Sequence, residues 1–262
     1  GCAVDRTGAT QASMGVAAGD YDGDGRPDLM CTHFMDESNT LYRNLGAAGF
    51  EDVTGLVGLH EPTLPFLGFG AVMEDFDCDG WMEILVANGH IENFPGNPLL
   101  RMRPQLFEWN GDRFVDQSLA AGPFFSEKQV GRGVATADFD GDGDLDAVVV
   151  HQNTPTALLE NRSDRGHWLS VQLHGTRSNR RGVGARVRVT AGDRVHVRQL
   201  TAGTSYVSAH EPLLLFGLGE HEGPVDVEVD WPVLGEGSPS TQRIQAVAVD
   251  RRLTVTESTG DP

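Results

Sequence analysis

Residues 20–28 read Asp-Tyr-Asp-Gly-Asp-Gly-Arg-Pro-Asp, and this stretch decides the fold. Carboxylates stand at its first, third and fifth positions, and they converge when the backbone wraps around a central point. Glycine at the sixth position permits the sharp turn that this wrapping requires. An EF-hand loop would need Glu at position 12, where Cys31 stands, and the flanking residues are strand-like. The stretch therefore predicts a cation-binding loop between two β-strands.

The same pattern occurs twice more, with Asp75 lying 55 residues after Asp20 and Asp138 lying 63 residues after Asp75. Because all the expected ligand atoms are oxygens, we expect Ca²⁺, about one ion for each loop. The alternative is a set of Asp-Gly turns without ions, in which the gathered carboxylates would repel one another. The predicted ligands, with the seventh residue using its carbonyl, are Asp20, Asp22, Asp24, Arg26 and Asp28; Asp75, Asp77, Asp79, Trp81 and Glu83; and Asp138, Asp140, Asp142, Asp144 and Asp146.

The three loops mark an internal repeat over the first 161 residues. Each repeat offers about four short strand-like runs, which is typical of a β-propeller blade. Three blades are fewer than a closed propeller typically has, so we expect a partial or oligomer-completed β-propeller. Blades missing upstream, two chains combining and an open arc remain as alternatives. Val4–Gly8 is similar to Glu51–Gly55, so an outer strand is expected at the N-terminus as well.

The remaining residues are also predicted to be β-structure, in a small sandwich or barrel. Apolar and polar residues alternate with period two in several runs, two of them joined by a turn at 191–193. The expected domains are therefore residues 1–162 and 163–262. A basic cluster is expected to pair with the acidic domain or to face solvent, with an anionic ligand as the alternative. Its members are Arg177, Arg180, Arg181, Arg186 and Arg188.

The net charge of −18 disfavours nucleic acid and anionic membranes as partners, and no apolar run is long enough to span a membrane. Three bound Ca²⁺ ions would bring this charge to −12. Three cysteines at irregular spacing make no disulfide framework. The Gly1-Cys2 start indicates a processed or constructed N-terminus and leaves open a lipid anchor at Cys2.

His33, His90 and His151 are the weak catalytic candidates, because each follows the strand after an acidic loop. Side chains on one propeller face could bind a transition metal or supply a general base. The favoured interpretation is three loop histidines without a joint role. No nucleophile elbow, P-loop or dinucleotide fingerprint occurs in the sequence, so a non-enzymatic protein is favoured over an enzyme.

Residues 3–161 resemble the FG-GAP/VCBS repeats of calcium-binding propellers. The rest resembles the ASPIC/UnbV domain of the cartilage acidic protein-like bacterial family, with departures at Ala209 and Leu215. The stretches that carry this second resemblance are His167–Leu169, Ser178–Ala185, Gly203–Tyr206, Phe216–Gly219 and Val229–Pro232.

This resemblance implies an extracytoplasmic, calcium-binding protein that acts as a binding, adhesion or assembly module. A protein or glycan partner is expected, with self-association or a larger complex as a further possibility. The Pro- and Asn-rich insertion His90–Arg103 is the expected contact loop. Two alternatives stay open. One is an enzyme of specialised metabolism with its site on the propeller face, and the other is a fragment or subunit of a larger assembly.

Overall fold

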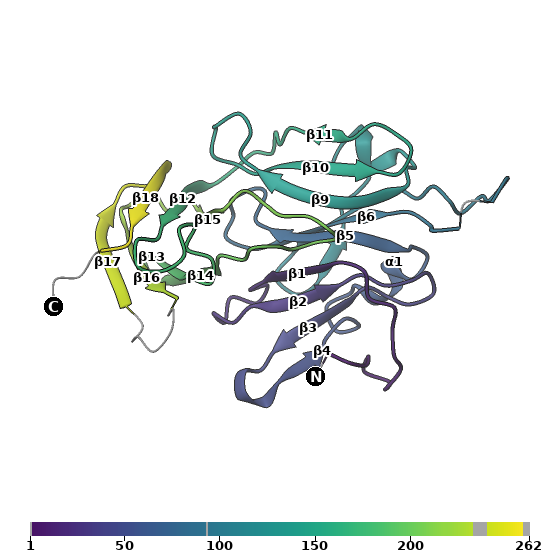
Figure 1. The fold of residues 1–262 in the computed structure, drawn as a ribbon, viewed down its shortest axis with the longest axis horizontal. Helices are drawn as coiled ribbons and strands as arrows, with labels where there is room; N and C mark the ends of the chain where they lie inside the picture. Colours follow the sequence, from purple (N-terminus) through teal and green to yellow (C-terminus); the bar gives the residue numbers. More distant parts are fainter. Residues whose placement is uncertain (1, 93, 233–239, 259–262) are drawn as a thin grey trace.

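The computed structural model describes residues 2–92, 94–232 and 240–258. Within these ranges the strands form five sheets, accompanied by the short helix α1 (His60–Thr63) and the 3₁₀ turns η1 (Gly46–Ala48) and η2 (Pro123–Ser126) (Figure 1). The all-β prediction is therefore confirmed. Gly1 of the Gly-Cys start and Asn93 of the expected contact loop lie outside the described residues, as do residues 233–239 and 259–262 of the expected second domain.

Three sheets built from the repeats lie side by side in the manner of a β-propeller (Figure 1). The first contains β1 (Val16–Gly19), β2 (Asp28–Cys31), β3 (Thr40–Asn44) and β4 (Phe50–Asp52), in that order. The second contains β5 (Gly68–Glu74), β6 (Glu83–Asn88), β7 (Gln105–Trp109) and β8 (Phe114–Asp116). The third contains β11 (Ala157–Leu159), β10 (Asp146–His151) and β9 (Gly131–Ala137), in that order across the sheet.

Two hydrophobic cores hold these three sheets together, one on each face of the middle sheet. Alternation along β5 sends Ala71 and Met73 into the core shared with the first sheet, and Val72 into the core shared with the third. Met30 and Leu41 complete the first of these cores. A sheet that is buried on both faces needs apolar residues at successive positions, and β5 and β6 are buried almost throughout.

The N-terminal segment departs from the prediction, because Val4–Gly8 forms turns and no strand. The Asp5 carboxylate accepts hydrogen bonds from the backbone N–H groups of Thr7, at 2.8 Å, and Ala9, at 2.9 Å. These local bonds use the donors that a strand would offer to a neighbouring strand, which is how aspartate favours turns. The segment still meets the first sheet, since the Arg6 amide donates to the Asp52 carboxylate of β4.

Two further sheets occupy residues 167–256. One has the order β15 (Leu213–Gly219), β12 (His167–His174) and β18 (Arg251–Thr256), with β12 and β18 parallel. The other has the order β14 (Arg194–Gln199), β13 (Arg186–Ala191), β16 (Val225–Trp231) and β17 (Ser240–Val247). One hydrophobic core joins them, and Leu169, Phe216, Val187 and Trp231 are buried in it.

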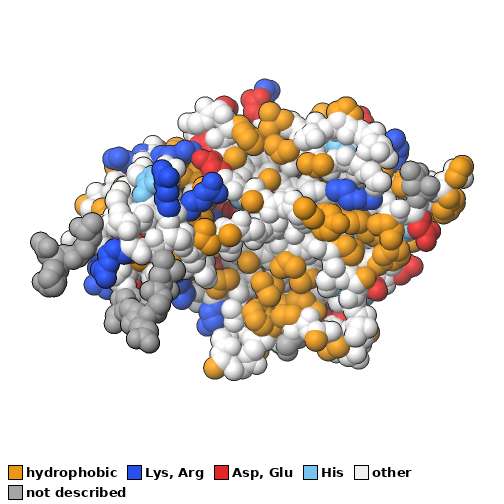
Figure 2. Space-filling view, in the orientation of Figure 1, with side chains coloured by type: hydrophobic (Ala, Val, Ile, Leu, Met, Phe, Trp, Pro, Cys, Tyr) orange, Lys and Arg blue, Asp and Glu red, His pale blue; other side chains and the backbone are white. Residues whose placement is uncertain are grey.

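The C-terminal sheets lie against the end of the first three sheets that carries the acidic loops (Figure 1). The connection between β14 and β15 reaches back across the inner strands, where Ser205 and Val16 exchange two backbone hydrogen bonds. Lys and Arg side chains gather mainly over the C-terminal sheets, whereas apolar side chains gather over the first three sheets (Figure 2). The acidic loops therefore face a part of the molecule that is rich in arginine.

Candidate metal sites

Each acidic loop joins two antiparallel strands, and the strand register closes the loop on itself. The last residue of β1, Gly19, pairs with the ninth loop residue, Asp28. Glu74 pairs with Glu83 in the same way, and Ala137 pairs with Asp146. Positions one and nine of each loop are therefore adjacent, as the sequence pattern predicts.

The structure gathers three carboxylates in each loop, with ligand atoms all within 4.8 Å of one another. The first and second loops use positions one, three and nine, whereas the third uses positions one, three and five. The three sets are Asp20, Asp22 and Asp28; Asp75, Asp77 and Glu83; and Asp138, Asp140 and Asp142. Such oxygen-only groups suit a hard divalent cation.

The other predicted carboxylates lie outside these sets and are engaged elsewhere. Asp24 forms an ion pair with Arg26. Asp79 accepts the Trp81 amide at 2.7 Å. Asp144 forms an ion pair of 2.8 Å with Arg165, although its carbonyl was the group predicted as ligand.

The ninth-position carboxylate also makes the same local hydrogen bond in all three loops. It accepts the backbone N–H of the second loop residue, from Tyr21 to Asp28 at 3.2 Å, from Phe76 to Glu83 at 2.7 Å and from Phe139 to Asp146 at 2.9 Å. Asp146 additionally accepts the amide of Asn161 at 2.8 Å. Asp28 likewise accepts the amide of Asn44 at 2.7 Å and still belongs to the first set, so these bonds do not decide which carboxylates gather.

The second loop offers the strongest indication that a cation belongs there. Asp75 is 1% exposed, and its Oδ1 atom has no hydrogen-bond partner. A buried carboxylate oxygen without a partner is costly unless a ligand satisfies it. Burial raises the pKa of Asp75 and of Asp28 to about 7, and burial together with the nearby Asp75 raises the pKa of Glu83 further. A bound cation would remove this cost by keeping the carboxylates ionised.

Arginines partly offset the charge of the loops. Arg43 pairs with Asp22 at 2.7 Å in the first loop, and Arg165 pairs with Asp142 at 2.9 Å in the third. Two further arginines come from the C-terminal strands: Arg198 of β14 lies 3.8 Å from Asp75, and Arg252 of β18 lies 3.2 Å from Asp138. The sequence did not single out these last two arginines, since each stands in an ordinary alternating strand.

The basic cluster behaves in several ways. Arg186 donates to the carbonyl of Gly25 in the first loop, which matches the expected pairing with the acidic domain. Arg188 instead pairs with Glu228 and Asp230 of the neighbouring strand. No ion pair involves Arg177, Arg180 or Arg181 among the residues that the structure describes.

The three histidines are held separately. His33 is buried and its Nδ1 lies 3.1 Å from the carbonyl of Ala12, whereas Nδ1 of His90 accepts the Glu92 amide at 3.0 Å. Nδ1 of His151 lies 2.9 Å from the carbonyl of Pro155. In the described parts of the chain, no candidate metal group contains any of them. Their local partners account for their positions without a shared site.

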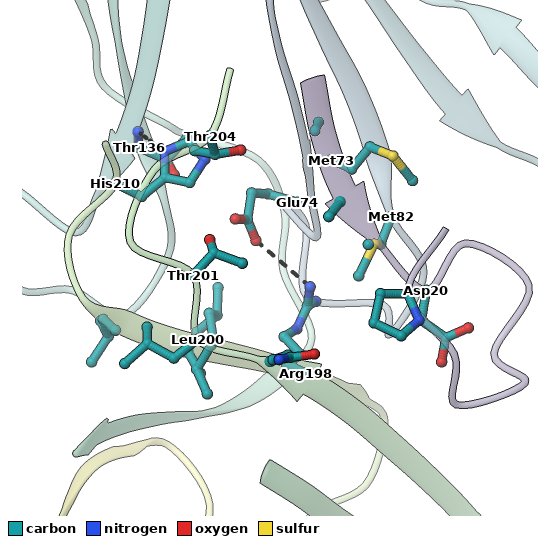
Figure 3. A pocket seen from close by; sticks show the side chains of 18 of the residues that line it. Asp20, Met73, Glu74, Met82, Thr136, Arg198, Leu200, Thr201, Thr204 and His210 are labelled. Carbon is teal, nitrogen blue, oxygen red and sulfur yellow. Dashed lines mark hydrogen bonds and ion pairs between the residues drawn. The ribbon is translucent and has the colours of Figure 1, made fainter. Parts of the chain in front are cut away.

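A cavity of about 190 Å³ lies between the acidic loops and the C-terminal strands (Figure 3). Glu74 and Arg198 form an ion pair of 3.6 Å in it. Nδ1 of His210 accepts the Thr136 amide at 3.0 Å. Met73 and Met82 form the opposite wall. Residues far apart in the sequence build this cavity, and no sequence motif indicated it.

Comparisons with known proteins match two regions of this chain. Residues 20–86 match the FG-GAP-like repeat, and residues 175–262 match the ASPIC and UnbV domain. The chain is 29% identical to cartilage acidic protein 1 of Homo sapiens and 26% identical to that of Xenopus tropicalis, over 85% of this chain in both. It spans about a third of the length of these curated relatives, 33% and 34% respectively.

No helix among the described residues has the length and apolar character needed to cross a bilayer. The two matched regions fall in the two parts of the structure that meet at the acidic loops, and the first match ends within β6. The chain thus carries an FG-GAP-like repeat followed by an ASPIC and UnbV domain, and 85% of this chain is similar to cartilage acidic protein 1.

Proposed function

We propose that this chain is a calcium-stabilised β-propeller protein that acts outside the cytoplasm as a binding or adhesion module. The observation that carries the proposal is the triple occurrence of the carboxylate group, together with the unpartnered, buried Oδ1 of Asp75. One acidic cluster is common on protein surfaces. Three that occupy the same place in successive repeats, with one of them buried, support a shared cation-binding purpose.

Calcium is the proposed ion because of the ligand chemistry. Every gathered side chain is a carboxylate, without the nitrogen or sulfur ligands that zinc and copper favour. Calcium accepts six to eight oxygen ligands in flexible geometry, so the remaining fifth-position carboxylates and seventh-position carbonyls, predicted from the sequence, would complete its shell. In this proposal each loop holds one ion, and the ion staples the hairpin between two inner strands.

We propose two domains, residues 1–162 and 163–262. The three repeat-derived sheets would be three propeller blades, and the two C-terminal sheets would form a small sandwich. The single hydrophobic core between the C-terminal sheets supports the sandwich, since it draws residues from β12, β13, β15 and β16 alike. The two cores on either face of the middle repeat sheet support the blades.

A protein or glycan is the proposed partner, and the loop His90–Arg103 is the proposed contact surface. Ile91, Phe94 and Leu99 of this loop are 54%, 53% and 46% exposed, although large apolar side chains are normally buried. The loop lies at the end of β6 opposite the acidic loops (Figure 1). The relatives are named for cartilage, a tissue made largely of extracellular matrix, and this name supports a location outside the cytoplasm.

Calcium titration calorimetry on three proteins tests the proposal: the parent chain, Asp75→Asn and the control Asp112→Asn. Asp112 lies in an exposed turn and belongs to none of the carboxylate groups. The parent and the control should bind about three ions, whereas Asp75→Asn should lose one binding event. Magnesium should bind more weakly, because it demands stricter octahedral geometry. Absence of any calcium-dependent heat in the parent would refute the proposal.

A further inference from the structure

We infer that the second acidic loop, Asp75–Glu83, is the docking surface for the C-terminal sheets, and that cation binding in this loop stabilises the docking. This inference rests on the proposed cation binding and adds a role for one particular site. The interface lies within one chain. There the ion would connect the second acidic loop with the C-terminal sheets, which are far from it in the sequence.

The outward-facing carbonyl groups of the loop carry the docking contacts. The amide of Gly166 donates to the Asp77 carbonyl at 2.9 Å, and the amide of Gly219 donates to the Cys78 carbonyl at 2.9 Å. Arg194 of β14 lies within 3.5 Å of the Asp79 carbonyl and stacks over the Trp81 ring at 5.0 Å. The loop therefore presents consecutive carbonyls to the C-terminal strands.

Two glycines, one just before β12 and one in β15, permit this close approach. A Cβ atom at Gly217 of β15 would collide with the Asp75 carboxylate and with the backbone of Cys78. A Cβ atom at Gly166 would lie 2.5 Å from the Cys78 carbonyl oxygen, which is closer than any real contact. Any other residue at these positions would push the strand away from the loop.

Cys78 adds an apolar contact at a loop position where the other two loops have glycine. It stands at the fourth loop position with φ +58°, where the first and third loops have Gly23 at +71° and Gly141 at +80°. This conformation is costly for any residue with a side chain. The Cys78 side chain is fully buried with Leu145 and Leu215, so its burial offsets that cost.

The second loop differs from the other two in the kind of contact that it makes with the C-terminal residues. Among the described residues, only this acidic loop forms backbone-to-backbone hydrogen bonds with residues 163–258. The first loop receives the Arg186 side chain, and the third receives the Arg252 side chain and packs against the Trp168 ring. Side-chain contacts tolerate small shifts of a loop, whereas paired backbone groups require a fixed loop conformation.

The geometry of the second loop makes cation binding and docking of the C-terminal sheets cooperative. Carboxylates of Asp75, Asp77 and Glu83 converge inside the loop, while the carbonyls of residues 77–79 face outward. A cation would fix the inward groups and so hold the outward carbonyls in place for Gly166 and Gly219. Without it, repulsion among the carboxylates favours an opened loop that loses these acceptors. Coupling is reciprocal, so docking should in turn raise the cation affinity.

Thiol labelling with iodoacetamide at fixed pH tests this inference, because Cys78 lies in the interface itself. Labelling of Cys78 and of Cys31 is followed by peptide mass spectrometry, in excess Ca²⁺ and in excess chelator. Cys31 is the internal control, since it is buried at the end of β2 opposite to the acidic loop and touches none of the second loop's docking contacts. We expect Cys78 to react about tenfold faster in chelator while Cys31 changes much less, because local opening exposes only the interface.

A matched pair of variants gives a second readout. Gly217→Ala should expose Cys78 to labelling even in excess Ca²⁺, whereas Gly223→Ala should behave as the parent. A Cβ atom at Gly223 would contact only the His221 ring, 3.3 Å away at the closest. Calcium titration on the same samples distinguishes a failure of this inference from a failure of the proposed function. Calcium binding with an unchanged Cys78 rate, or equal acceleration of both cysteines, overturns the inference alone; no calcium binding overturns the proposed function as well.

Discussion

Gly219 donates its backbone N–H to the carbonyl oxygen of Cys78 across 2.9 Å, so a C-terminal strand is bonded directly to an acidic loop of the propeller repeats. The acidic loops therefore have two surfaces. In each loop three carboxylates converge, and in the second loop the backbone also bonds to the C-terminal residues. The proposed cation site and the contact with the C-terminal sheets are therefore built from the same nine residues of the second loop.

The stabilisation by calcium should depend on pH. Without calcium, folding raises the pKa of Asp28, Asp75 and Asp144 to about 7, from about 3.9 in the unfolded chain. The folded state then binds more protons between those values, so stability in chelator should fall as the pH rises from 4 to 7. With calcium present, protons compete with the ion, so the stabilisation by calcium should grow over the same range.

Melting temperatures at pH 5, 6, 7 and 8, each in chelator and in excess calcium, check this prediction. The difference between the two melting temperatures should increase with pH. A difference that is constant across the series would show that the buried carboxylates do not hold the ion.

Replacement of Gly143 should destabilise the third loop more than replacement of its neighbour Gly141. Both glycines have positive φ, +98° and +80°, so alanine is strained at either position. A Cβ atom at Gly143 would also collide with the Trp168 ring, whereas nothing lies within 4 Å at Gly141. We expect Gly143→Ala to cost about 1–3 kcal/mol more in unfolding free energy, which is typical of overpacking. Urea unfolding measures both, and equal costs would contradict the packing of Trp168 on this loop.

Glu257 should be a stabilising residue of the C-terminal domain. Its buried carboxylate accepts the backbone N–H groups of Thr176, Arg177 and Ser178 at 2.9, 2.8 and 2.7 Å, and so fixes the arginine-rich loop after β12. Glu257→Gln weakens charge-assisted bonds and should cost about 1.5–3 kcal/mol. The control Glu160→Gln alters an exposed side chain paired with Arg162, so urea unfolding should show a change below about 0.5 kcal/mol. Equal stability of the two variants would contradict this role.

Local sequence signals predicted the strands well. The ninth loop residue ends each acidic loop, and β2, β6 and β10 each begin there, at Asp28, Glu83 and Asp146. The turn at 191–193 and its alternating flanks likewise correspond to the β13–β14 hairpin. Such features depend on neighbours in the chain, which a sequence displays directly. Convergence of the first- and third-position carboxylates is also local, whereas the same spacing adds position nine in the first two loops and position five in the third.

Contacts between distant segments could not be predicted in this way. Arg198 and Arg252 reach acidic residues through the packing of the C-terminal strands on the acidic loops, and their local sequence resembles any solvated strand. Cys78 stands where the other loops have glycine, and its burial with Leu145 and Leu215 is a packing feature that the sequence does not display. The N-terminal strand was wrong because the Asp5 side chain captures nearby amides. Gly217 and Gly219 could have indicated the contact between β15 and the second loop, since paired glycines in a strand often mark close approach of another backbone.

Thermal unfolding in excess Ca²⁺ and in excess chelator tests the central claim most directly. An ion that binds only the folded state stabilises it by about 2.7 kcal/mol per site at a hundredfold excess over its dissociation constant. With about three sites, we predict a large drop in melting temperature when calcium is removed, restored by adding calcium back. An unchanged melting curve in excess chelator would contradict the account.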